Sequence, residues 1–139
     1  MTMKNFLTYV LLTTFVFYKI DAICIPTRLK FAVKIENALP HNTTDQLKFN
    51  CKSGDTDLGY HALNVGQSYE WSFCANFFGK TLYFCNFQWG TKHQSFDVFS
   101  KSTPKDCPHG VCKWVAMLDG FYSSNPNYYG YLEKVHDWL

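Results

Sequence analysis

The chain has almost no arginine. Arg28 is the only one among its 139 residues, and every other fully basic side chain is a lysine. Charged residues make up only 17% of the sequence, and the formal net charge is +2. Arginine is the side chain that best pairs with phosphate and guanine, and binding to nucleic acid or to an anionic membrane surface favours a strongly basic face. We therefore expect neither nucleic acid nor a membrane surface among its partners.

The sequence also lacks an apolar run long enough to cross a membrane. A spanning helix needs about 20 apolar residues, whereas the run at residues 6–17 has 12. It follows Lys4 and precedes Ala22, a small residue suited to cleavage, so it matches a secretory signal peptide. We expect residues 1–22 to be a signal peptide and residues 23–139 to be one domain that is secreted and extracellular. The alternative is an N-terminal signal anchor.

Motifs of the common hydrolases are missing as well. There is no Gly-x-Ser-x-Gly turn for a serine nucleophile and no glycine-rich loop for phosphate. Asp55 and Asp57 lie in one loop, whereas a glycosidase needs two carboxyl groups that flank the sugar. The histidines are His41, His61, His93, His109 and His136. They share no spacing, so we expect no enzyme and no cofactor; a secreted ribonuclease that uses two histidines is the alternative.

Two segments have some features of metal sites. Asp55-Thr56-Asp57 offers carboxylate oxygens for calcium, but the further ligands of a calcium loop are missing. Cys107-x4-Cys112, with His109 between the cysteines, has a loosely finger-like spacing, but no second ligand pair of matching spacing accompanies it. We therefore expect no metal site.

The cysteines and one sequon fit the secretory route. All six cysteines follow the expected signal peptide, and an even number in an oxidising compartment predicts disulfide bonds. Asn42-Thr43-Thr44 follows Pro40 in a polar stretch that we expect to be an exposed loop, which predicts glycosylation at Asn42.

Alternation of apolar and polar residues predicts strands along most of the domain. Residues 81–89 give the strongest signal, and Asp119-Gly120 is typical of a hairpin turn. Other expected strands lie at residues 29–36, 47–52, 59–65, 69–74, 93–99, 111–118 and 121–122. In the tail, residues 128–131 suit an edge strand and residues 132–139 a strand end or a short helix. Seven or eight short strands predict an all-β, antiparallel β-sandwich with long loops, stabilised by disulfides.

Aromatic residues make up 19% of the chain, enough to fill the space between two sheets. We expect Trp71 and Trp114 to be core residues because they alternate with polar neighbours. Tyr122, Tyr128, Tyr129 and Tyr131 lie among glycine and asparagine, and we expect them to form an exposed contact patch.

Several short motifs follow one another between Val33 and Tyr122. They are Val33-x-Ile35-x-Asn37, Cys51-Lys52-Ser53, Asp55-x-Asp57-Leu58-Gly59, Gly66-x-x-Tyr69-x-Trp71-x-Phe73, Asn76-Phe77-Phe78-Gly79-x-Thr81-Leu82, Cys85-x-Phe87-x-Trp89, Phe96-Asp97-Val98-Phe99, Cys107-x4-Cys112-x-Trp114 and Asp119-Gly120-x-Tyr122. In this order they resemble the plant self-incompatibility S-protein family. The resemblance implies a small secreted β-sandwich without catalytic activity. In the poppy-type system a member is a stigma-secreted ligand recognised by incompatible pollen, and most other members are homologues without an assigned role.

The resemblance also implies where a partner binds. The expected partner of this chain is a cell-surface receptor, contacted through loops that follow strands, and the chain is expected to be monomeric. The candidate contact residues are Asp55, Thr56, Asp57, Leu58, Asn76, Phe77, Phe78 and Lys80. The alternative function is a carbohydrate- or cell-wall-binding module that uses exposed aromatic side chains.

Four cysteines match the recurring cysteines of the family, namely Cys51, Cys85, Cys107 and Cys112. The short turn between Cys107 and Cys112 can bring them within disulfide reach, so we favour that pair together with Cys51–Cys85. Cys24 and Cys74 depart from the family pattern. They remain open as an additional bridge, as free thiols or, for Cys24, as a link between chains.

Overall fold

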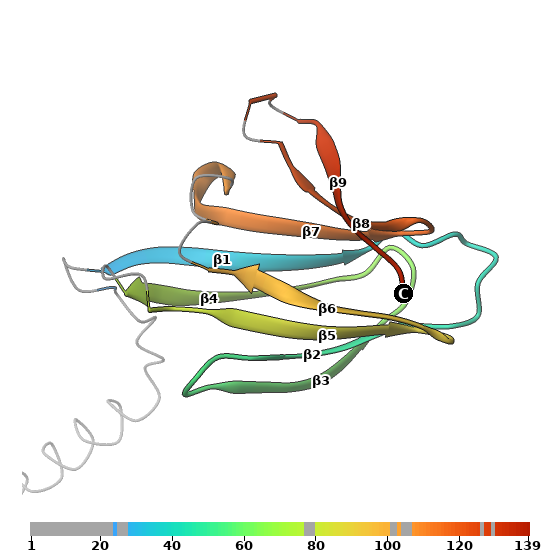
Figure 1. The fold of residues 1–139 in the computed structure, drawn as a ribbon, viewed down its shortest axis with the longest axis horizontal. Coiled ribbons are helices and arrows are strands. Elements are labelled where there is room, and N and C mark those ends of the chain that lie inside the picture. The colour runs from blue at the N-terminus through green and yellow to red at the C-terminus, as the bar shows by residue number, and fades with distance from the viewer. Residues whose placement is uncertain are drawn as a thin grey trace, which may run out of the picture.

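The computed structural model describes Cys24, residues 28–76, 80–100, Thr103, 107–125, 127–128 and 130–139, except for the side chains of Arg28 and Asn76. Within these residues the chain forms nine strands, which Figure 1 shows as two layers. The strands are β1 (Arg28–Asn37), β2 (Leu47–Lys52), β3 (Asp57–Leu63), β4 (Ser68–Asn76), β5 (Tyr83–Trp89), β6 (Lys92–Phe99), β7 (Val111–Met117), β8 (Gly120–Ser124) and β9 (Leu132–Asp137). A 3-10 turn, η2 (Pro108–Gly110), precedes β7. The expected signal peptide, residues 1–22, lies outside the described residues.

The strands form two sheets that pack face to face. Sheet A has the order β4-β1-β7-β8-β9 and sheet B the order β3-β2-β5-β6. All neighbouring strands are antiparallel except β1 and β7, which are parallel. The chain passes from β6 in sheet B to β7 in sheet A at the end where β1 begins, so β1 and β7 run in the same direction. The predicted all-β sandwich is confirmed, with one parallel pair and with the tail residues Leu132–Asp137 as an additional strand.

Alternation along the strands produces the core. In β5 the side chains of Tyr83, Cys85 and Phe87 are buried, whereas those between them are exposed. β1 contributes Val33 and Ile35, both completely buried, from the opposite sheet. Burying an aliphatic or aromatic side chain of this size stabilises the fold by roughly 1.5–3 kcal/mol. The two tryptophans expected in the core are buried, since Trp71 is 8% exposed and Trp114 is 6% exposed.

One end of the sandwich, which we call the turn end, carries four connections between strands. It contains residues 38–46, 64–67, 90–91 and 118–119. Asn37, only 2% exposed, joins two of these connections. Its side-chain amide donates to the Leu63 carbonyl at 2.9 Å, and its side-chain oxygen accepts from the Leu39 N–H at 3.0 Å. Its backbone N–H donates to the Gln67 carbonyl, and its carbonyl accepts from Gly66. Because all four groups are paired, a buried polar residue is stable here.

The last residues of the chain close one side of the sandwich. Leu139 exchanges two backbone hydrogen bonds with His93 of sheet B, at 2.9 and 3.2 Å. Trp138 packs its ring 4.6 Å from that of Phe121, and its indole N–H donates to the Met117 carbonyl. The C-terminal residues therefore link sheet A to sheet B. Among the described residues, no helix has the length and apolar character needed to span a membrane.

Candidate functional site

The two segments that the sequence singles out for partner contact meet at the other end of the sandwich, which we call the loop end. This end contains the connection at 53–56 and the described residues of three further connections, 80–82, 107–110 and 130–131; the starts of β1, β5 and β7 mark it on the left of Figure 1. The 53–56 and 80–82 segments border one open depression of about 560 Å³. The residues that line it are Ser53, Gly54, Asp55, Thr56, Phe73, Cys74, Lys80, Thr81, Leu82 and Tyr83.

The β2–β3 connection is organised by its own hydrogen bonds. The backbone N–H of Ser53 donates to the Thr56 carbonyl at 2.8 Å, which closes a turn. Inside that turn the Asp55 carboxylate accepts from the Ser53 hydroxyl at 3.0 Å and from the Thr56 hydroxyl at 3.3 Å. An aspartate that bonds its neighbours in this way is typical of a turn that holds one conformation. The loop is thus ordered before any partner arrives.

Asp57 begins β3 and shapes the strand entry. Its carboxylate accepts from the Gly59 N–H at 2.9 Å and lies 3.8 Å from the Lys52 ammonium. Gly59 has φ +75°, a left-handed conformation that a side chain would strain. The pairing register between β2 and β3 shifts between Asn50 and Lys52, which marks a bulge at this point. The bulge lies at the loop end, where it turns β3 away from ideal pairing.

Tyr83 lies beneath the β2–β3 connection and ties it to the core. The side chain is 6% exposed and its ring packs 4.6 Å from Phe73. Burial is the main reason that the pKa of Tyr83 is raised, and the Asp55 carboxylate raises it further; hydrogen bonds with Ser53 and Thr56 act in the opposite direction. The hydroxyl therefore stays protonated and bonded to the loop. The sequence placed Tyr83 in the strongest strand signal, residues 81–89, but did not reveal its bond to the β2–β3 connection.

The candidate contact residues differ in accessibility. Asp55, Thr56 and Asp57 are exposed on the β2–β3 side and Lys80 is exposed on the other side of the depression. Leu58 is half-buried and packs against the core, so it supports the loop more than it offers contact area. Asn76 is the last residue of β4, and its side chain is not described. Phe77 and Phe78 lie outside the described residues.

Three disulfide bonds lie toward the loop end. Cys51 and Cys85 are directly opposite each other on β2 and β5, with their Cα atoms 4.1 Å apart. A second bridge joins Cys107 to Cys112, and a third joins Cys24 to Cys74. The first two are the pairs favoured from the sequence, and the third is the additional bridge that the sequence left open. All six cysteines are described residues, and none is free.

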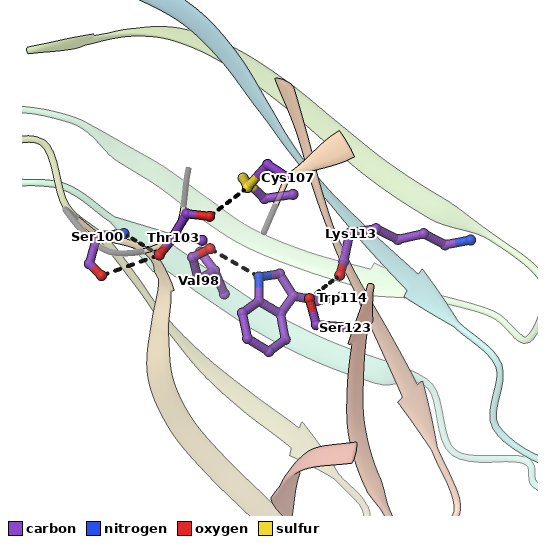
Figure 2. The surroundings of a disulfide bond; sticks show 8 residues. Val98, Ser100, Thr103, Cys107, Lys113, Trp114 and Ser123 are labelled. Carbon is purple, nitrogen blue, oxygen red and sulfur yellow. Dashed lines mark hydrogen bonds between the residues drawn. A yellow bond between two sulfur atoms is a disulfide. The ribbon is translucent and has the colours of Figure 1, made fainter. Parts of the chain in front are cut away.

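Figure 2 shows how the Cys107–Cys112 bridge is embedded. Thr103 accepts a hydrogen bond at its hydroxyl from the Ser100 N–H at 2.8 Å, and its carbonyl oxygen lies 3.2 Å from the Cys107 sulfur. A half-cystine sulfur has no proton to donate, so this second approach is a close S···O contact. Nearby, the indole N–H of Trp114 donates to the Val98 carbonyl at 3.0 Å. The indole thus links β7 to the end of β6, and the bridge links β7 to the segment that precedes it.

The histidines occupy separate environments. The His61 ring stacks 3.9 Å from Tyr69, and its Nε2 is 2.8 Å from the Leu58 carbonyl oxygen. The His136 ring stacks 4.0 Å from Phe96, where burial lowers the pKa of the imidazole. These two rings pack against different strands. Within the described residues, no group of three or more His, Cys, Asp or Glu side chains could hold a metal ion.

The remaining sequence candidates lie on the surface. Asn42 is exposed in the β1–β2 connection at the turn end. Tyr128 and Tyr131 are 64% and 71% exposed, and their rings are 6.3 Å apart at 80° to each other. Two perpendicular rings do not form one flat platform for a sugar chain. Tyr122 donates instead to the Asp119 carboxylate at 2.8 Å; Tyr129 lies outside the described residues.

Known plant proteins are similar in sequence to a large part of this chain. S-protein homolog 2 and S-protein homolog 6 of Arabidopsis thaliana are each 38% identical to it, over 95 and 100 residues. Each match covers 66% of this chain, and the matches span 58% and 73% of those relatives.

One solved structure has the same fold. It is described as "Structure of SPH (Self-Incompatibility Protein Homologue) proteins, a widespread family of small, highly stable, secreted proteins from plants". It superposes with a TM-score of 0.61 at 17% identity, covering 80% of this chain and 96% of that chain. The model of the family described as "Plant self-incompatibility protein S1" matches residues 32–138, from within β1 to just beyond β9. The chain therefore belongs to the plant self-incompatibility protein S1 family.

Proposed function

We propose that the protein is an extracellular signalling ligand that a plant cell-surface receptor binds at the loop end. The observation that supports this most is that the two segments implicated from the sequence border one depression, between Asp55 on one side and Lys80 on the other. Binding residues are often carried on loops that a rigid scaffold positions.

The loop end is suited to recognition because it is pre-ordered and chemically varied. Asp55 is held by Ser53 and Thr56, so little conformational entropy is lost when a partner binds. The rim presents the Asp55 carboxylate and the ammonium group of Lys80, with the exposed Leu82 beside them. A receptor of mixed charge with an apolar contact would complement this rim.

We infer cleavage after Ala22, secretion, and glycosylation at Asn42, whose side chain is exposed as that modification requires. Asn42 lies at the turn end, opposite the depression. A glycan there would leave the loop end accessible. The secreted relatives described for the solved structure agree with this route.

We further propose that the ligand is monomeric and has no catalytic activity. His61 and His136 are engaged in separate aromatic stacks, so they are not arranged as an acid and base pair. Every cysteine is in a disulfide, so none is a thiol nucleophile in this state. Hydrolysis of RNA or of a glycan by the purified protein, abolished by His61→Ala or His109→Ala, would overturn this part.

The test of the receptor proposal compares charge reversals at the two ends. Asp55→Lys combined with Lys80→Glu should reduce saturable binding of labelled protein to plant protoplasts by at least tenfold. The matched control, Asp45→Lys with Lys48→Glu, reverses two exposed charges away from the loop end and should bind like the wild type. Circular dichroism verifies that both variants fold. Equal binding by both variants, or a loss confined to the control, would refute the proposal.

A further inference from the structure

We propose that the Cys24–Cys74 bridge is a thiol–disulfide exchange site, which an external dithiol opens while the other two bridges stay closed. Cys74 points away from the core. Its neighbours Phe73 and Ala75 face the core, so Cys74, between them on β4, faces the outer surface of sheet A. β4 is also an edge strand, with β1 as its neighbour in sheet A.

The other bridges are enclosed. Cys51 and Cys85 are completely buried, and Cys112 and Cys107 are 2% and 8% exposed. Cys24 and Cys74 are both half-buried. Exchange requires a thiolate to reach one sulfur of the bridge, so access separates a reducible bridge from a permanent one. By this criterion the Cys24–Cys74 bridge reacts first.

The charge beside Cys74 favours the same reaction. In the pairing of β1 with β4, Lys30 lies directly opposite Cys74, and both side chains project from the outer face. Side chains opposed in this way have Cβ atoms roughly 5 Å apart. Cys74 also borders the depression that Lys80 lines. Ammonium groups nearby stabilise a thiolate, which makes Cys74 the better leaving group in the exchange.

The reaction balances with a dithiol as the reductant. One thiolate of the dithiol attacks the Cys24 sulfur, the S–S bond breaks, and Cys74 leaves as a thiolate. The second thiolate of the dithiol then attacks the mixed disulfide and releases Cys24. The bridge gains two electrons, both cysteines end as thiols after taking up protons, and the dithiol leaves as its own disulfide.

Opening this bridge changes the loop end without unpairing a strand. Cys24 precedes β1, which begins at Arg28, so no strand pairing described here depends on it. Cys74 remains in β4 but loses its covalent link to the start of the domain. That this alters receptor recognition rests on the proposed function, whereas the exchange itself does not.

The test measures the order of reduction. The native protein is incubated with increasing dithiothreitol, quenched in acid, blocked with N-ethylmaleimide and mapped by mass spectrometry. Cys24 and Cys74 should be modified at dithiothreitol concentrations at least tenfold below those needed for the other four, with the far-ultraviolet circular dichroism unchanged. Modification of Cys107 and Cys112 first, or of all six together, would overturn the proposal.

Two sets of variants check the mechanism. The double variant Cys24→Ser, Cys74→Ser should take up no N-ethylmaleimide over the lower concentration range; uptake by any other cysteine there would contradict the assignment. Lys30→Gln should slow the exchange severalfold, whereas Lys30→Arg and the sheet B control Lys48→Gln should not. An unchanged rate in Lys30→Gln would remove the role of the ammonium group. The recognition experiment is separate, so either proposal can fail without the other.

Discussion

The two ends of the sandwich are held together by different kinds of bond. At the turn end, Asn37 pairs all four of its polar groups and joins two connections without any covalent link. At the loop end, three disulfides lie within the first or last three residues of strands or just outside them. The difference teaches that a buried amide can join connections at one end by hydrogen bonds, whereas disulfides join the neighbouring segments at the other end.

The difference also suits the proposed role. A disulfide stabilises the folded state mainly by restricting the unfolded chain. With the strand ends bridged, the residues of the loops between them are free to serve recognition instead of stability. The turn end has the opposite arrangement, since Asn37 and Gly66 are required by the geometry of the turns themselves.

The largest effect should come from the buried bridge of the loop end. Replacing both Cys51 and Cys85 by alanine should lower the free energy of unfolding by about 4 kcal/mol, because the bridge closes a long stretch of the unfolded chain at positions that the strands already hold together. Urea denaturation of the variant and the wild type measures the difference. A loss below about 1 kcal/mol would show that hydrogen bonds alone suffice at this end too.

The counterpart at the turn end is Asn37→Ala. It leaves the buried Leu39 N–H and Leu63 carbonyl without their partners, and we expect a loss of about 3 kcal/mol. The control is Asn64→Ala, an exposed amide of the same end, which should change stability by less than about 1 kcal/mol. Similar unfolding midpoints for the two variants would contradict the role given to Asn37.

The half-buried Cys24–Cys74 bridge should contribute less than the buried Cys51–Cys85 bridge, although it spans a longer stretch of sequence. Removing the bridge raises the conformational entropy of the unfolded chain, and it also frees Cys24 in the folded protein. These two increases in entropy partly cancel, so the loss of stability is smaller. We expect Cys24→Ser with Cys74→Ser to lower the unfolding free energy by about 2 kcal/mol. Thermal unfolding checks this order; a loss larger than that of the Cys51–Cys85 variant would reverse it.

The smallest effect concerns pH and the closing strand β9. Burial lowers the pKa of His136, so the unfolded chain takes up a proton at higher pH than the folded protein does. The neutral His136 ring contributes its full stability to the fold above the pKa that it has in the unfolded chain, about 6.5. This stability is lost as the pH falls from that value to the lower pKa of His136 in the folded protein. The His136 ring faces Phe96 and Trp114, and the charged residues Lys134 and Asp137 lie on the same strand as His136, β9.

The matching experiment follows unfolding between pH 7.5 and pH 5. His136→Gln should make the stability curve flatter than that of the wild type across this range, whereas His93→Gln at the exposed edge of β6 should not. Parallel curves for the wild type and His136→Gln would show that this histidine titrates alike in both states.

Much of the sandwich was predictable because burial follows the period of a strand. The alternation in residues 81–89 predicted a strand, and in β5 every second side chain from Tyr83 to Trp89 is buried or packed against the core. The tail was ambiguous for the same reason: most side chains of Leu132–Asp137 are exposed, so the segment carries no clear alternation. Its strand conformation depends on pairing with β8 and on Gly120, where a Cβ would collide with the His136 carbonyl.

The site was predictable only in part. The resemblance to the family indicated the Asp55 and Lys80 loops, but their meeting at one depression depends on how strands distant in sequence pair. The parallel pairing of β1 with β7 and the bond from Tyr83 to the β2–β3 connection are likewise tertiary features. Cys24 could not be assigned from the sequence because neither it nor its partner Cys74 matches a recurring cysteine of the family.

The most direct test of the recognition account is site-specific photo-crosslinking on living plant cells. A photoreactive amino acid is placed at Thr56 or Lys80 of the loop end, or at Thr91 or Leu118 of the turn end, all exposed or partly exposed positions. The account predicts crosslinks to one membrane protein from the loop end and none from the turn end. Crosslinks to a membrane protein from the turn end alone, or crosslinks from neither end on cells that bind the protein, would contradict it.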